Sequence, residues 1–129
     1  MNWKLIAKYA VGLMLAGIII GFVDASARPT EPVAVMAMTV SGYLMLLGVY
    51  MAIFMRMAVR QQDRPLLHGL LATGIACAAS FAVLLALSKG SALISPVSIL
   101  LELAVSFVAL VAGIRIGRRH RISRTAGDA

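Results

Sequence analysis

The chain has few of the charged residues that a soluble protein needs at its surface. Only 13% of its 129 residues are charged, and 61% are hydrophobic. A soluble domain usually carries about 25% charged residues, because its surface must be solvated. Half of that fraction leaves too little polar surface to cover a water-exposed globule of this size. The composition, with a mean hydropathy of +0.95, therefore predicts a single domain built for lipid.

Cysteine is also scarce, and its scarcity excludes whole classes of site. The single Cys77 excludes an intrachain disulfide and any multi-cysteine metal site. Neither His68 nor His120 has neighbours at a spacing typical of a metal centre or a catalytic triad. Met51 and Met55 stand one helical turn apart, a spacing that copper(I) sites use, but no cluster of His or Cys supports such a site. We expect no metal, no cofactor and no enzymatic activity.

What the chain does contain is four long apolar runs, at about 5–23, 33–55, 66–87 and 92–114. Each is close to the roughly 20 residues that a helix needs to cross the hydrocarbon core. Backbone groups cannot stay unpaired in lipid, and the alternation typical of a membrane barrel is missing, so these runs are predicted to be helices. The sequence thus predicts an all-α integral membrane protein, with residues 1–129 forming one four-helix bundle.

Proline and polar residues separate the four runs. Pro29 and Pro32 bracket the first connection, Pro65 closes the second, and residues 88–91 form a short turn before the fourth run. Proline cannot continue a helix and is favoured in its first turn. Connections this short place successive helices antiparallel and side by side, in an up-down order. Pro96, inside the fourth run, is a possible kink.

The distribution of basic residues predicts the orientation. Ten of the 12 Lys and Arg fall in the N-terminus, the middle connection and the C-terminal tail, leaving Arg28 and Lys89 on the other side. Positive residues stay in the cytoplasm, so both termini are predicted to lie inside a bacterial inner membrane. One alternative is that the first run, with Lys4, Lys8 and the small residues 25–27, is a signal peptide that is cleaved.

Glu102 is the first candidate for a functional residue. We expect it near the centre of the fourth helix, where an ionised side chain costs about 2.5–3.5 kcal/mol and must face protein or water. One stripe of small or polar residues contains Glu102 together with Ser98, Ser106, Ala109 and Gly113. The carboxyl group is either a proton- or cation-binding site or a polar contact between helices, with Tyr43 as the candidate partner.

Small residues form further stripes that predict close helix packing. Such faces let helix backbones approach each other in lipid, within the chain or across a homodimer. They occur in the first and third runs and comprise Gly12, Ala16, Gly17, Gly21, Gly69, Thr73 and Cys77.

The tail, residues 115–129, is predicted to be basic and cytoplasmic, with disorder from Ser123 onward. Its arginines suit the headgroups of anionic lipids, while the absence of base-stacking aromatics argues against nucleic acid. The predicted lipid contacts are Arg115, Arg118, Arg119 and Arg121.

In size and number of helices the chain resembles the small multidrug resistance transporters. The resemblance stops there, because their essential glutamate lies in the first helix, where this chain has none, and their aromatic-rich pocket is not matched. The first expectation is therefore an accessory or structural membrane protein, acting through helix–helix contacts in a homo-oligomer or a larger complex. The second is a small proton- or cation-coupled transporter or channel that uses Glu102.

Overall fold

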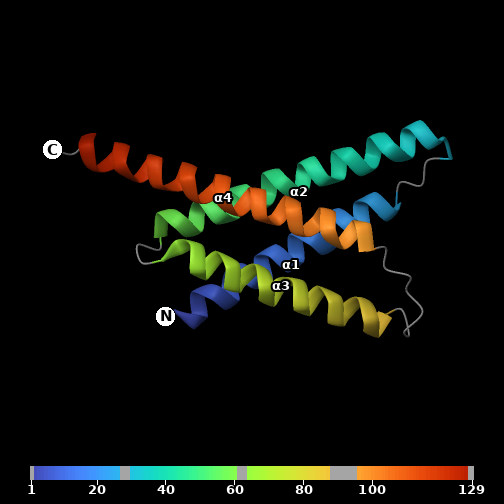
Figure 1. Cartoon of the computed structure of the whole chain (residues 1–129), viewed down its shortest axis with the longest axis horizontal. Helices are drawn as coiled ribbons and strands as arrows, with labels where there is room; N and C mark the ends of the chain where they lie inside the picture. Colours follow the sequence, from blue (N-terminus) through green and yellow to red (C-terminus); the bar gives the residue numbers. More distant parts are fainter. Residues whose placement is uncertain (1, 27–29, 61–63, 88–95, 128–129) are drawn as a thin grey trace.

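The structure, a computed structural model, describes residues 2–26, 30–60, 64–87 and 96–127, with only the backbone described at 24–25, 84–85, 87, 96, 98 and 121–127. Throughout these ranges the regular structure is helical and comprises α1 (Trp3–Ser26), α2 (Pro32–Arg60), α3 (Pro65–Leu87) and α4 (Pro96–Gly127). Successive helices run in opposite directions along the long axis (Figure 1). Each helix contains a segment long and apolar enough to cross a membrane. The predicted all-α chain with four membrane-length helices is confirmed.

The helices begin where the sequence supplies suitable residues. Asn2 caps α1, since its side-chain oxygen accepts a hydrogen bond from the backbone N–H of Leu5 at 3.2 Å. Pro32, Pro65 and Pro96 are each the first residue of a helix, where the missing N–H of proline costs nothing. The possible kink at Pro96 stays a prediction, because a kink needs a described helix on both sides of the proline. Residues 92–95, the predicted start of the fourth helix, lie outside the described residues.

The fourth helix is longer than the apolar run that predicts it. α4 continues through the basic segment to Gly127, so the disorder expected from Ser123 is wrong as far as that glycine. Between Arg118 and Ala126 there is no glycine or proline, and arginine is a good helix former. Extending an existing helix adds one hydrogen bond for each residue that it fixes, which favours continuation.

The helices pack most closely with partners that are not adjacent in sequence. α2 packs on α4 and α1 packs on α3, and the two helices of each pair cross in the view of Figure 1. α1 also contacts α2, whereas α2 and α3 make little contact. Because successive helices are antiparallel, both of these major pairs are parallel. The short connections thus set the direction of each helix, but they do not choose its packing partner.

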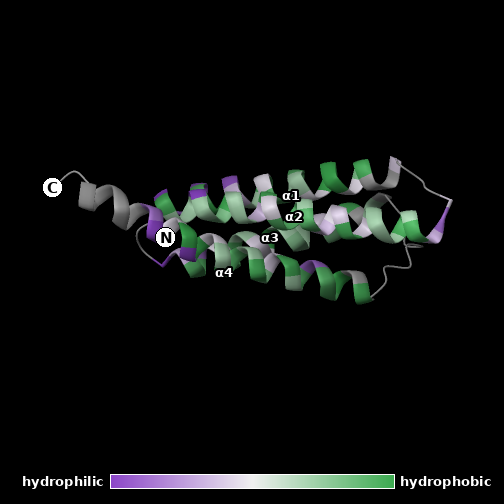
Figure 2. Cartoon of the chain, turned by 90° about the horizontal axis from the view of Figure 1, so that it is seen from above, coloured by the Kyte–Doolittle hydropathy of each residue, from purple (hydrophilic) through white to green (hydrophobic). Residues whose placement is uncertain are grey.

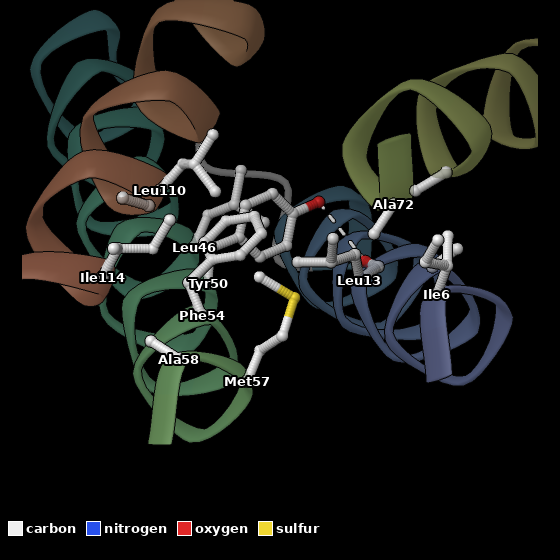
Figure 3. Packing of buried hydrophobic residues seen from close by; sticks show 13 residues of the cluster. Ile6, Leu13, Leu46, Tyr50, Phe54, Met57, Ala58, Ala72, Leu110 and Ile114 are labelled. Atoms are coloured by element: carbon white, nitrogen blue, oxygen red, sulfur yellow. Dashed lines mark hydrogen bonds between the residues drawn. The ribbon is translucent and has the colours of Figure 1, made fainter. Parts of the chain in front are cut away.

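The core lies where the two pairs meet. Leu46, Tyr50 and Phe54 recur every four residues on one face of α2 and are all buried. Tyr50 and Phe54 meet edge to face, with ring centroids 6.5 Å apart and an interplanar angle of 79°. Around them lie buried residues of the other helices and the end of α2, and Figure 3 draws them together with these three. They are Ile6, Ala10, Leu13, Met57, Ala58, Ala72, Ala76, Ala109, Leu110 and Ile114.

Large apolar side chains cover the outside of the bundle. Phe22 is 73% exposed, Val33 79% and Met36 72%, and the apolar exposure continues along all four helices (Figure 2). Exposing an apolar surface of this extent to water would be unfavourable, whereas lipid tails solvate it. The fold therefore fits a membrane protein, in agreement with the composition.

Candidate functional site

Glu102 lies in the first third of α4. The helix begins at Pro96, so the carboxylate stands six residues from its start, or about 9 Å along the axis. This corrects the expectation that Glu102 lies near the centre of its helix. The reason is that proline fixes a later start, and the arginine-rich segment extends the helix at its other end.

Glu102 borders a hollow between three helices. The hollow has a volume of about 320 Å³ and opens on the side of the bundle where α1 ends and α2 and α4 begin. Tyr43, the partner expected for Glu102, lines the same hollow, as do Gly17 and Gly21. Its remaining walls are Ile20, Thr39, Gly42 and Leu46. The floor and sides thus consist mainly of small or aliphatic residues, with three polar side chains.

On its other side, Glu102 borders a second and much smaller hollow inside the bundle. Thr73 and Cys77 of α3 line it, together with Ser106, which is buried at 2% exposure. The structure therefore brings these three predicted residues to Glu102. Leu13, Tyr50, Ala76 and Ser80 complete the lining. The side chain of Ser98 lies outside the described residues.

Tyr50 is a polar core residue that the sequence analysis missed. Its hydroxyl donates a hydrogen bond to the backbone carbonyl of Leu13 at 3.3 Å and so joins α2 to α1 (Figure 3). Gly17, one turn further along α1, leaves room for this hydroxyl, since a Cβ atom there would lie 3.2 Å from it. Such bonds contribute about 0.6 kcal/mol in membrane proteins. The four-residue spacing of Tyr50 from Leu46 and from Phe54 is the signal in the sequence that could have identified Tyr50 as a core residue.

The carboxyl group of Glu102 has no hydrogen-bond or ion-pair partner among the described side chains. Within the described part of the chain, Glu102 is exposed and takes part in no hydrogen bond or ion pair. No cluster of three or more His, Cys, Asp or Glu side chains that could hold a metal ion occurs among the described residues. The hollow therefore presents a single acidic group to whatever approaches this side of the bundle.

The predicted small-residue faces lie in different surroundings. Gly12 and Gly21 of α1 face open space, since a Cβ atom at either position would meet nothing within 4 Å. Ala16 packs against the core, half-buried. Gly69 of α3 touches Leu110 and Met57, and so contacts both α4 and α2.

Two glycines of α4 lie against the backbone of α2, and the sequence analysis singled out only the first of them. A Cβ atom on Gly113 would lie 2.7 Å from the carbonyl oxygen of Met51, and one on Gly117 would lie 2.8 Å from that of Met55. The two glycines form a GxxxG motif, a signal for close backbone approach that is visible in the sequence. The crossing of α2 and α4 depends on them.

The described basic residues gather at the end of the bundle opposite the hollow. Figure 2 shows hydrophilic residues gathered at the end that carries the N-terminus and the second half of α4, with others at the start of α2. Arg115, Arg118 and Arg119 project from α4 there and are exposed, while the side chain of Arg121 lies outside the described residues. The starts of α1 and α3 and the end of α2 contribute Lys4, Lys8, Arg56, Arg60 and Arg64.

Comparison with known proteins finds no matching protein family, no similar characterised protein and no similar solved structure.

Proposed function

We propose that this chain is a small multi-pass protein of a bacterial inner membrane, with both termini in the cytoplasm. The apolar exterior and the four membrane-length helices support the membrane location. The clustering of the described Lys and Arg side chains at one end supports the orientation, because basic residues are retained on the cytoplasmic side. The hollow beside Glu102 then opens toward the outer leaflet.

Within that membrane, the protein acts through contacts with other helices, either a second copy of itself or a subunit of a larger complex. The observation that carries this proposal is the carboxyl group of Glu102, which is exposed and has no partner among the described side chains. An ionised carboxylate facing lipid would cost about 2.5–3.5 kcal/mol at the centre of a bilayer and less near the interface. A neighbouring helix that donates a hydrogen bond removes this cost.

The walls of the hollow favour such a neighbour. Gly21 and Gly42 line it, and Gly21 and Gly12 have open space where a side chain would begin. A second helix can approach a surface of this kind closely, so its polar groups come within reach of Glu102 and Tyr43. Small residues beside a single polar group are typical of association between membrane helices.

The association is tested by substituting Glu102 in the full-length chain. Hydrogen bonds between membrane helices contribute about 1–2 kcal/mol in model peptides, so Glu102→Leu is expected to weaken association about 5- to 30-fold. Glu102→Gln is expected to retain most of it, because an amide still forms hydrogen bonds. The measurement is energy transfer between labelled copies in bilayers of varied lipid-to-protein ratio, accompanied by recovery of co-purifying membrane subunits.

Glu31→Leu is the matched control, since it removes an exposed carboxylate that does not line the hollow. It is expected to leave association unchanged. A chain that stays monomeric in bilayers and brings down no membrane subunit would overturn the proposal, as would equal association of the Glu102→Leu and wild-type chains.

The second candidate function is a small proton- or cation-coupled transporter or channel, in which Glu102 binds the coupling ion. The observation that favours it is that Glu102 borders both hollows, the open one and the inner one. Transport by this residue requires that the inner hollow, about 10 Å³ in the structure, widen and open to the other side of the membrane. In reconstituted vesicles, Glu102→Gln is then expected to abolish a cation-driven flux, and a flux that survives this substitution would exclude the mechanism.

A further inference from the structure

A shallow groove of about 500 Å³ runs along α4, and all of its described lining residues belong to this helix and lie away from the hollow beside Glu102. Two parallel rows of side chains line it, and within each row successive residues are four apart, which places them on one side of a helix. Ala112, the smallest of them, interrupts its row. The first row is Phe107, Val111, Arg115 and Arg119, and the second is Val108, Ala112 and Ile116.

The groove is apolar over most of its length and cationic at one end. Phe107 and Val108 are 60% and 54% exposed at the apolar end. Arg115 and Arg119 are both exposed and stand one helical turn apart at the other end, where the described basic residues of all four helices gather. A guanidinium group binds phosphate with two parallel hydrogen bonds. The ammonium group of lysine is a point charge without this matching geometry.

We propose that this groove binds one anionic phospholipid of the inner leaflet. An acyl chain lies along Phe107, Val111 and Ala112, and the phosphate group lies between Arg115 and Arg119. The length and polarity of the groove match an amphiphile of this kind, and the anionic headgroup complements its charge. This site is separate from the helix-contact surface of the proposed function, and its place in the inner leaflet rests on the orientation proposed there.

Charge decides between a lipid and a second copy of the chain as the occupant. By sequence, the N-terminus, the middle connection and the C-terminal tail carry ten Lys and Arg against two acidic residues, Asp63 and Asp128. Two copies with these ends together would repel each other, because like charges are unfavourable at an interface. An anionic headgroup is attracted to the same residues.

The test uses the full-length chain in a neutral detergent and measures lipid binding by native mass spectrometry at low ionic strength. Phosphatidylglycerol and phosphatidylcholine with the same acyl chains are the two probes. The double variant Arg115→Gln/Arg119→Gln is expected to bind phosphatidylglycerol about 30-fold more weakly than the wild-type chain, with little change for phosphatidylcholine. The matched control Arg56→Gln/Arg60→Gln removes two charges from the same end of the bundle, and its affinity is expected to change less than threefold.

A second variant tests the apolar part of the groove without changing any charge. Ala112→Phe fills the groove and is expected to weaken phosphatidylglycerol binding at least threefold, while glycerol phosphate, which has the same anionic chemistry but no acyl chain, is expected not to compete. If both double variants lost the same affinity for phosphatidylglycerol, the basic end would attract anionic lipids only through its overall charge, without a specific site. Unchanged binding by Ala112→Phe, or competition by glycerol phosphate, would mean that the groove plays no part; each of these results would overturn the proposal.

Discussion

Gly113→Leu is expected to destabilise the folded chain by at least about 3 kcal/mol, the upper part of the range for overpacking. Even the first added carbon would lie 2.7 Å from the carbonyl oxygen of Met51 and 2.9 Å from the Cβ atom of Phe54. A backbone carbonyl cannot turn aside as the end of a flexible side chain can. The two helices must therefore separate, which loses packing along the whole crossing of α2 and α4. The measurement is the free energy of unfolding in mixed detergent micelles.

The controls for this substitution are glycines that face open space. A Cβ atom on Gly48 of α2 or Gly74 of α3 would meet nothing within 4 Å, and both residues are exposed. Gly48→Leu and Gly74→Leu are expected to be neutral, or to stabilise the chain by up to about 1 kcal/mol, because leucine favours the helix more than glycine does. If Gly113→Leu were as stable as these variants, the close crossing of α2 and α4 would be contradicted.

Phe54→Ala is expected to destabilise the chain by about 2 kcal/mol. Phe54 is fully buried, meets Tyr50 edge to face and lies against the crossing at Gly113. In soluble proteins such a truncation costs about 3–5 kcal/mol, part of which is transfer of the ring into water. A ring that leaves this core meets lipid instead, so that only the loss of packing and the cavity remain. The same unfolding measurement detects the change.

Phe22→Ala is the matched control, because Phe22 is 73% exposed on α1. Its truncation is expected to change the free energy of unfolding by less than about 0.5 kcal/mol, as at most surface positions. A loss at Phe22 equal to that at Phe54 would mean that the exposed face of α1 is buried in a stable oligomer under the conditions used. The pair of variants therefore also reports on association.

Two surfaces of the bundle have different chemistry and have no lining residue in common. The hollow beside Glu102 presents an acidic group among small residues, which suits a neighbouring helix. The groove on α4 presents two arginines above apolar side chains, which suits an anionic lipid. Because the two do not share a residue, substitutions at Glu102 and at Arg115 are expected to affect association and lipid binding independently.

The candidate site was predicted in part. The intramembrane position of Glu102 made it conspicuous, since a single acid in a long apolar run needs a compensating environment. Tyr43, Ser106, Thr73 and Cys77 line the two hollows that it borders. Tyr50 was missed because its role depends on the distance between α1 and α2, which periodicity within one helix does not contain. Gly117 was missed although the GxxxG motif that it forms with Gly113 is visible. The sequence does not show which of several small-residue faces packs closely against another helix.

By itself, the sequence determined that the chain is all-helical, that it has four membrane-length helices and where most of them begin. These properties follow from local causes: unpaired backbone groups are excluded from lipid, and proline is favoured at the first position of a helix. Only the tertiary structure decided that α2 packs on α4 and α1 on α3, and that Glu102 stays exposed beside a hollow. In lipid, apolar side chains are solvated equally well on every face, so hydrophobicity does not select partners. Shape and a few polar groups select them instead, and these become visible only when the helices are placed together.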